Sequence, residues 1–333
     1  MKEYISLSHG SGGALTRKLV HEIFAAAFDN AYLRKLDDAS VVTLAGGRYA
    51  MTTDSFVVDP IVFPGGDIGK LAVCGTVNDL ASCGAEPKYL SASFVIEEGF
   101  ALGSLRTIVS SMAREAREQK TAIVTGDTKV VPRGKADKLF INTTGIGFVH
   151  KLLDTKKIRP GDKILINGPV AQHGLSILAS RQGFEGRTSI KSDCKSLWGI
   201  VKLLLQEHVD VHFMRDPTRG GVSAAANEIA QSCGFSLALL EKRIPATASC
   251  RSLCEILGLE PLDIANEGKM LFFVGESDAP KALRLLRSVP SCRQAALIGE
   301  VLSEKKSKVY LETSAGGSRV LGMPVTDAIP RIC

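Results

Sequence analysis

The chain has 333 residues, enough for about two domains with substantial hydrophobic cores. A composition of 45% hydrophobic and 23% charged residues excludes a disordered or collagen-like chain despite the 32 glycines. The net charge of +6 is too dilute to predict nucleic-acid binding, and no apolar run approaches the ~18 residues of a membrane span. Because the polar start also lacks a signal-peptide core, we expect a cytoplasmic protein that binds neither nucleic acid nor membrane.

Strands and helices alternate in the first half of the chain. Apolar residues at helical spacing predict a helix over 15–36 and an amphipathic helix over 103–119. Residues 68–82 predict a further helix, whose small side chains allow close packing. Apolar and β-branched runs predict strands, and these cover 49–53, 57–63, 121–127 and 138–149.

A charged segment at 151–162 ends in a Pro-Gly turn and separates the two halves. The second half predicts further strands, at 163–167, 270–274, 295–301 and 308–312. It also predicts helices, at 171–182, 194–207, 221–233, 249–257 and 278–288. We therefore expect an α/β protein with an N-terminal domain over 1–150, a C-terminal domain over 151–322 and a mobile, extended tail over 323–333.

The eight cysteines include no C-x-x-C pair, which argues against a zinc ribbon or a thioredoxin motif. We expect most of them to be reduced and buried. Cys333 differs because it lies at the end of the extended tail. A thiol there is able to carry a covalent group into a site, and the alternative is a chance terminal cysteine.

The two common nucleotide-binding fingerprints, the P-loop and G-x-G-x-x-G, are both incomplete. Acidic residues recur instead in short turns of small residues, and these are Asp38, Asp54, Asp79, Asp127 and Asp216. Each alone is most simply a helix cap or a turn residue. As a set they predict a site for Mg²⁺ and a polyphosphate, because Mg²⁺ takes oxygen ligands and leaves positions for phosphate. Lys129 would add a positive charge to the same phosphates.

Two further segments suggest a site. The sequence His9-Gly10-Ser11-Gly12-Gly13 precedes the first expected helix, and its amides are suited to closing over an anion. A plain flexible terminus is the alternative. Glu267 lies in a polar turn, 265–269, where it would act as a general base or as a phosphate-site carboxylate. The alternative for Glu267 is an ordinary surface glutamate.

These runs resemble the HypE family of hydrogenase maturation factors. The resemblance covers nearly the whole chain and rests on DDAS, TTDSFVVDPIVFPGGDIGKLAVCGTVNDLA, TGDTKVV, MRDPTRGG, ANEGK and the final PRIC. That family belongs to a superfamily with aminoimidazole ribonucleotide synthetase, selenophosphate synthetase and thiamine-monophosphate kinase. The resemblance implies two AIR synthase-like (PurM-like) α/β domains, with ATP between them. It also implies a homodimer in which the N-terminal domains pair into a shared barrel.

The reaction that the resemblance implies takes place on the tail. The carbamoyltransferase HypF would place a carbamoyl group on Cys333. ATP would then drive dehydration of this S-carboxamide to a thiocyanate. The cyanide would finally pass to iron on the HypC and HypD scaffold, as a ligand for nickel-iron hydrogenase.

Residue roles follow from matching motif to motif. Asp38, Asp54, Asp79 and Asp216 resemble the family's Mg²⁺ and phosphate carboxylates. Asp127 and Lys129 match a nucleotide-site loop of the family, in which Lys129 is also expected to be catalytic. Glu267 is the expected general base. The arm residues His9, Gly10, Gly12 and Gly13, together with Thr53, Asn78 and Asn266, are expected to contact the nucleotide.

Two alternatives stay open. One is another ATP-dependent enzyme of the superfamily. Selenophosphate synthetases carry a cysteine or selenocysteine in the glycine-rich arm, which this chain lacks, and a thiamine-monophosphate kinase has no use for a terminal thiol. The other is a non-enzymatic thiol carrier, in which the acids are structural turns.

Overall fold

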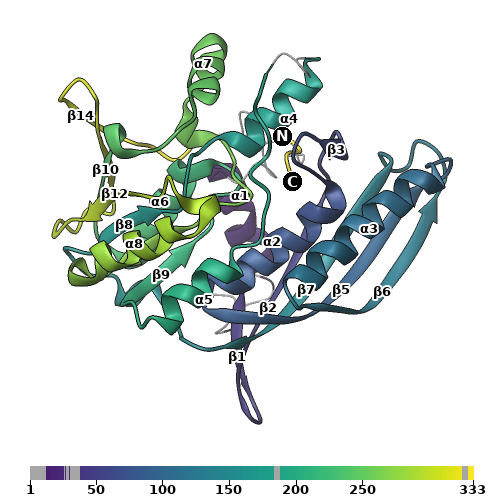
Figure 1. The fold of residues 1–333 in the computed structure, drawn as a ribbon, viewed down its shortest axis with the longest axis horizontal. Coiled ribbons are helices and arrows are strands. Elements are labelled where there is room, and N and C mark those ends of the chain that lie inside the picture. Colours follow the sequence, from purple (N-terminus) through teal and green to yellow (C-terminus); the bar gives the residue numbers. More distant parts are fainter. Residues whose placement is uncertain (1–12, 26, 28–29, 31–37, 184–187, 325–328) are drawn as a thin grey trace.

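The computed structural model describes residues 13–25, 27, 30, 38–183, 188–324 and 329–333 (Figure 1). Among these residues, the first half forms a five-stranded sheet in the order β1-β2-β7-β5-β6. The strands are β1 (Ser40–Leu44), β2 (Gly47–Phe56), β5 (Ala85–Glu97), β6 (Ala122–Val131) and β7 (Leu139–Val149). Neighbours are antiparallel except β5 and β6, which are parallel because helix α3 (Leu102–Glu118) crosses between them. A separate two-stranded hairpin pairs β3 (Val62–Phe63) with β4 (Gly66–Asp67).

Helices α2 (Ile68–Ser82) and α3 lie side by side on one face of this sheet (Figure 1). The carboxylate of Asp67 starts α2 by accepting hydrogen bonds from the amides of Gly69 and Lys70. Within α2, which is described in full, every residue except Lys70 and Asp79 is buried. A Cβ atom at Gly69 would lie 2.5 Å from the carbonyl oxygen of Ile108 on α3. The expected close packing of a small-residue helix is therefore confirmed.

The opposite face of the sheet is uncovered by the described residues. Met51, Ile146 and Tyr89 lie opposite one another on the adjacent strands β2, β7 and β5. Their side chains are 51%, 40% and 53% exposed, respectively. An apolar patch of this kind is typical of a surface that associates with a partner.

The described part of the second half forms a seven-stranded sheet in the order β14-β13-β10-β12-β8-β11-β9. The strands are β8 (Lys163–Ile166), β9 (Val211–Arg215), β10 (Leu237–Leu240), β11 (Leu271–Val274), β12 (Ala296–Val301), β13 (Val309–Glu312) and β14 (Ser318–Val320). The helices of this half are α4 (Gln172–Arg181), α5 (Trp198–Gln206), α6 (Gly221–Cys233), α7 (Ala248–Leu257) and α8 (Ala279–Ser288). Short 3-10 turns connect them, at Thr155–Lys157, Glu241–Arg243, Pro261–Asp263, Glu276–Asp278 and Pro290–Cys292.

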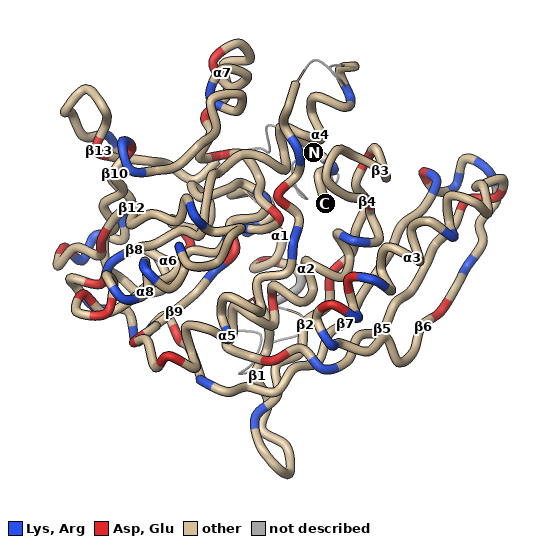
Figure 2. Tube along the Cα trace, viewed as in Figure 1, with Lys and Arg blue, Asp and Glu red and all other residues tan. Residues whose placement is uncertain are grey.

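The two halves share one continuous hydrophobic core, because α2 packs against α5 and β9 of the second half as well as against its own sheet. Lys and Arg are interspersed with Asp and Glu along the chain in both halves (Figure 2). Within the described residues, no helix has the length and apolar character needed to cross a membrane.

Several sequence predictions were wrong in detail. In the helix expected over 15–36, α1 (Ala14–Leu19) continues as a π-helical segment (Val20–Ala25), and most of the remainder lies outside the described residues. In the expected strand 57–63, only Val62–Phe63 pairs, since Pro60 lacks an amide to donate to a ladder. Helix α5 begins at Trp198, not at 194. Strands β5, β9 and β10 were not predicted.

Candidate functional site

Four of the predicted acids meet where the two halves join. Asp38 precedes β1, Asp54 lies on β2, Asp79 on the last turn of α2, and Asp216 directly after β9. All four line one cavity of about 500 Å³. The set therefore comes from segments far apart in the sequence, which only the packing of α2 between the sheets brings together.

The acids raise one another's pKa values. Burial raises the pKa of Asp79 well above its usual range, and the charges of Asp216, Asp54 and Asp38 raise it further. Burial and the charge of Asp38 raise the pKa of Asp216 to about 8. Asp79 is thus the carboxylate that the other three affect most strongly, and the charged forms of these acids are disfavoured unless a cation neutralises them.

Positive groups offset part of this charge. The Arg215 guanidinium contacts Asp38 at 2.8 Å and Glu228 of α6 at 2.7 Å. Asp79 instead accepts a 2.8 Å hydrogen bond from the Thr52 hydroxyl. Arg17 of α1 and Arg219 also line the cavity. Asp38 is therefore neutralised by a direct ion pair, whereas Asp79 is held by a neutral donor.

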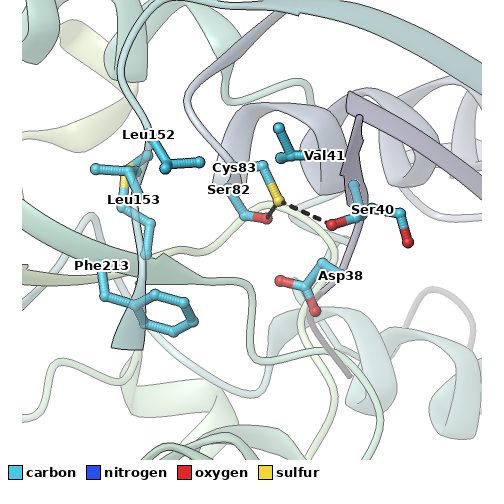
Figure 3. Close-up of a pocket in the computed structure, with 10 residues that line it drawn as sticks. Asp38, Ser40, Val41, Ser82, Cys83, Leu152, Leu153 and Phe213 are labelled. Atoms are coloured by element: carbon cyan, nitrogen blue, oxygen red, sulfur yellow. Dashed lines mark hydrogen bonds between the residues drawn. The ribbon is translucent and has the colours of Figure 1, made fainter. Parts of the chain in front are cut away.

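A small pocket of about 20 Å³ lies behind Asp38 and has room for one water molecule at most. Figure 3 shows Asp38 at one side of it, with Leu153 and Phe213 opposite and the Cys83 thiol directed toward a backbone carbonyl. These apolar neighbours give the physical reason why burial raises the pKa of Asp38. The pocket supports the acid and is too small for a ligand.

In the described ranges, no three His, Cys, Asp or Glu side chains come together as a ready-made metal site. Magnesium is usually bound through one or two carboxylates plus substrate phosphates and waters. Several half-buried or buried carboxylates that destabilise one another's charge fit a cation of that kind. The arrangement thus matches a cation that arrives with a polyphosphate better than a closed protein cage.

The loop after β9 brings a helix N-terminus to the cavity. Gly220 and Gly221 have φ values of +72° and +62°, which glycine adopts most easily, and they turn the chain into α6. A Cβ atom at Gly221 would lie 2.3 Å from the Leu262 carbonyl oxygen. Thr218 and Arg219, which precede the helix, line the cavity. Backbone amides at such an end favour anions, phosphates included.

Glu267 is buried, only 3% exposed, so the alternative of a surface glutamate is excluded. Burial raises its pKa well above the usual range, and the nearby Cys194, Asp216 and Asp54 raise it further. Asp193 fixes the backbone around it by accepting hydrogen bonds from the amides of Glu267 and Gly268. Glu267 therefore lies within electrostatic range of the cavity acids Asp216 and Asp54, as a carboxylate whose proton affinity is high.

Asp193 itself pairs with Lys269 at 2.7 Å, and both side chains are 3% exposed. Burial alone would raise the pKa of Asp193, but the Lys269 ammonium lowers it below the usual range. Breaking one partner of such a buried pair leaves an uncompensated charge, so the pair holds the Glu267 loop firmly. Asp193 was not among the predicted site residues, because a lone aspartate in a polar loop has no distinctive spacing.

Asn78 and Asn266 bind protein groups in this conformation. Asn78 donates to the Lys195 carbonyl and accepts from the Leu197 amide, which ties α2 to the second half. Asn266 donates to the Pro217 carbonyl and accepts from the Ala171 amide. Both amides thus position the acids and Glu267, and their predicted contact with nucleotide stays a prediction.

Asp127 and Lys129 lie apart from the acidic cavity. They form an exposed ion pair of 2.8 Å on β6, the edge strand, three strands away from Asp54 on β2. The strand register pairs Asp127 with Ser93, Ser93 with Asn142, and Asn142 with Ser55. The side chains of these four residues therefore point to the uncovered face. The Thr53 hydroxyl lies on this face too, 3.0 Å from that of Thr144. One subunit therefore divides the predicted nucleotide residues between two faces of its sheet.

The end of the tail is docked between the halves (Figure 1). Ile332 is 1% exposed, and Cys333 packs half-buried against the core. The Val57 amide, just beyond β2, donates a 3.0 Å hydrogen bond to the Cys333 carbonyl. Val57 follows Asp54 by three residues, so the backbone that binds the end of the tail lies at most about 10 Å from the backbone of Asp54. Cys333, which we expected on a mobile tail, is therefore half-buried between the two halves.

Part of the arm lies outside the described residues, including His9, Gly10 and Gly12. Gly13 is described and buried, and it precedes the first residue of α1. The Ala14 amide donates to the Pro324 carbonyl at the start of the tail. The arm and the tail therefore meet, and the predicted closure of the arm over nucleotide stays a prediction.

Sequence comparisons agree with this arrangement. Models of the N-terminal and C-terminal domains of AIR synthase related proteins match residues 36–149 and 159–312. The carbamoyl dehydratase HypE of Cupriavidus necator is 46% identical over 99% of this chain and 95% of its own length.

Solved structures give the same result. A hydrogenase maturation protein HypE in complex with ATP has 46% identity and a TM-score of 0.83, covering 99% of this chain and 100% of that one. A HypE in a HypE-HypF complex has 43% identity and a TM-score of 0.86, covering 92% of this chain and 99% of that one. With two matched AIR synthase domains and nearly half of its residues identical to a full-length relative, the chain belongs to the HypE family of carbamoyl dehydratases.

Proposed function

We propose that the protein uses ATP to dehydrate an S-carbamoyl group on Cys333 to a thiocyanate, as a step in supplying cyanide for nickel-iron hydrogenase. One observation carries the proposal. The terminal cysteine is docked at the junction that also holds the acidic cavity and the buried Glu267. A non-enzymatic carrier would not need a buried carboxylate of raised pKa at the junction where its thiol docks.

The chemistry balances in two stages. The carboxamide oxygen of Cys-S-C(=O)-NH₂ attacks the γ-phosphorus of ATP, ADP leaves, and the nitrogen loses one proton to give a phosphorylated imidate. Loss of the second nitrogen proton then forms C≡N as the C–O bond breaks and phosphate leaves. The protein must orient the oxygen, exclude water and accept the protons.

Glu267 is the proposed proton acceptor. A carboxylate is a stronger base when its pKa is raised, and burial together with Cys194 and the cavity acids raises that of Glu267. Asp193 fixes its backbone, and the charges of Asp216 and Asp54 reach its carboxylate. The general base and the phosphate site are thus neighbours.

ATP would lie in the acidic cavity with Mg²⁺ held by Asp79, Asp54 and Asp216. The ion would neutralise charge on the phosphates and on these carboxylates. Asp38 is the least available of the four predicted ligands because Arg215 pairs with it. Thr218, Arg219 and the start of α6 would contact phosphate oxygens.

We further propose a homodimer through the uncovered sheet face, where Met51, Tyr89 and Ile146 are exposed. Asp127 and Lys129 extend from the same face. Pairing of two such faces would carry the Asp127 and Lys129 of each subunit to the nucleotide site of the other. This arrangement reconciles their predicted role with their distance from Asp54 within one subunit.

HypF is the proposed carbamoyl donor, in line with the HypE-HypF complex, and the HypC and HypD scaffold is the proposed acceptor of cyanide. Loading needs an exposed thiol, so the tail must leave the position seen here and return. A reduced Cys333 is required throughout, and no disulfide joins any of the eight cysteines, all of which lie in described residues. These points support the cytoplasm as the location.

Intact-mass analysis tests the function directly. Cyanate converts a thiol to an S-carboxamide, which provides loading without HypF. Loaded protein given Mg²⁺ and ATP should lose the mass of one water, mapped to the Cys333 peptide, with one ADP released per conversion. Protein without ATP and the Cys333→Ala variant are the controls. ATP hydrolysis with no change of mass at Cys333 would contradict the proposal.

A further inference from the structure

Two side chains of helix α4 hold the main chain of the docked tail. His173 Nε2 lies 2.6 Å from the Ile332 carbonyl oxygen. The Arg181 guanidinium donates to the carbonyls of Pro330, Arg331 and Asp59. Both side chains bind backbone atoms, so they hold the path of the chain whatever the tail side chains are. We refer to His173 and Arg181 as the tail clamp.

The hydrogen bonds determine which nitrogen of His173 carries the proton. A carbonyl oxygen only accepts, so Nε2 must donate to Ile332. Nδ1 then accepts from the Ser192 hydroxyl at 2.8 Å, and the Ser192 oxygen accepts from the Cys194 amide at 3.0 Å. His173 is fully buried, and burial lowers its pKa, in keeping with a neutral ring.

The clamp leads directly to the proposed base. Ser192 precedes Asp193, whose carboxylate accepts from the Glu267 and Gly268 amides. A Cβ atom at Gly268 would lie 1.9 Å from the Asp193 carbonyl oxygen, so the two segments pack without a gap. The N-terminal end of α4 contacts the same loop, because the Gly174 amide donates to the Ala265 carbonyl. Helix α4 therefore contacts the tail and the Glu267 loop together.

The main chain is held on both sides of the Cys333 Cα atom. The preceding carbonyl, of Ile332, is bound by His173, and the Cys333 carbonyl is bound by the Val57 amide. With these groups fixed, rotation about χ1 is the main freedom left to the thiol. A loaded carboxamide would then have few orientations to search before it met ATP.

We propose that His173 and Arg181 are positioning residues, which align the loaded Cys333 with Glu267 and ATP. The inference rests on the proposed function. Misplacement by about 1 Å is enough to cost about a hundredfold in rate, so the clamp acts on the dehydration step and not on ATP binding or on loading.

The first experiment compares dehydration with loading. His173→Asn shortens the side chain so that it no longer reaches Ile332, whereas His173→Gln keeps a donor near the Nε2 position. His208→Asn is the matched control, because His208 is exposed and its φ of +53° is one that asparagine tolerates. We expect His173→Asn to slow single-turnover dehydration of loaded protein about 10- to 100-fold, with ATP affinity unchanged and loading as fast as wild type or faster. His173→Gln should recover most of the rate.

The second experiment follows the tail without any catalysis. Iodoacetamide labelling of unloaded protein, quantified on the Cys333 peptide, reports how often the tail leaves the docked position. His173→Asn and Arg181→Met should each raise the labelling rate several-fold. His208→Asn and Arg117→Met, which alters an exposed arginine of α3, should leave it unchanged.

Three results for the clamp variants would overturn the inference. Labelling rates equal to wild type would do so, and so would faster labelling with normal dehydration. The third is a parallel loss of loading and dehydration with a lower melting temperature, as expected of a merely structural role. Failure of the proposed function is recognisable separately. Wild-type protein would then leave the carboxamide unchanged, while the variants would still differ in labelling rate.

Discussion

Helix α2 and strand β6 both carry predicted site residues, yet their environments are opposite. Asp79 lies on a helix that is buried on nearly every side, and burial raises its pKa well above the usual range. Asp127 lies on a strand that is exposed along almost its whole length. Hydrogen bonds from Lys129 and the Thr128 amide lower its pKa.

The two carboxylates differ in their partners. Asp79 accepts a hydrogen bond from a neutral hydroxyl, whereas Asp127 is paired with the ammonium group of Lys129. The acids around Asp79 destabilise each other's charge, so binding of Mg²⁺ and ATP would relieve an unfavourable interaction. Asp127 already pairs with Lys129, and in the proposed dimer it would gain a role where the second subunit covers it. In the proposed function, the site residues on α2 would be complete in one subunit, whereas those on β6 would depend on the proposed dimer.

The largest effect should come from the buried carboxylate nearest the chemistry. Glu267→Gln should slow dehydration of loaded protein by about 10²- to 10⁴-fold and leave ATP affinity within about twofold, because a proton acceptor is removed and the shape is kept. The wild-type rate should rise with pH as Glu267 loses its proton, and this rise should vanish in the variant. Rapid-quench kinetics of the mass change provide the measurement. A variant that keeps the wild-type rate would assign the base elsewhere.

Asp79→Asn should weaken Mg²⁺-dependent ATP binding about a hundredfold, measured by calorimetry with and without the metal. The same variant should melt a few degrees higher than wild type without ligand. It removes a carboxyl group whose ionised form is disfavoured by the charges of three other acids. Asp127→Asn is the matched control, since its charge is already paired, and it should not raise the melting temperature. Loss of stability in Asp79→Asn would contradict the electrostatic account.

Mixing two inactive variants tests whether β6 acts across a dimer. Lys129→Met and Asp79→Asn should each be impaired alone. Mixed dimers should regain activity, since one of their two sites would combine an intact Asp79 with the partner's intact lysine. If both residues served the same subunit, mixing would restore nothing.

Ile146→Lys should dissociate the dimer in sedimentation and lower activity with it, because it places a charge in the apolar patch.

The smallest effect concerns stability and pH. The pKa of Asp216 is raised to about 8, and that of Asp79 is also raised. Between the ordinary aspartate range and about pH 8, the folded protein therefore holds more protons than the unfolded chain. The free energy of unfolding without ligand should fall as pH rises through this window, by at most about 1.4 kcal/mol per pH unit for each extra proton. Denaturant titrations at pH 6 and pH 8 measure it, and Asp79→Asn should flatten the slope.

The sequence by itself determined what depends on neighbouring residues. The small side chains of 68–82 and the spacing of 103–119 were enough to predict α2 and α3. The short acidic turns were enough to group Asp38, Asp54, Asp79 and Asp216, which line one cavity, and the longer motifs identified the family. These features are local, because helix periodicity and turn chemistry involve residues a few positions apart.

Only the tertiary structure decided which residues meet. Strands β5, β9 and β10 escaped prediction because a strand is defined by distant partners. Register alone turned Asp127 and Lys129 toward the face opposite Asp54, since neighbouring residues of a strand point to opposite sides. His173 and Ile332 are 159 positions apart, and their contact required the packing of both halves. A side chain's pKa and partners depend on that packing, so the chemistry of the site was decided where the two halves meet.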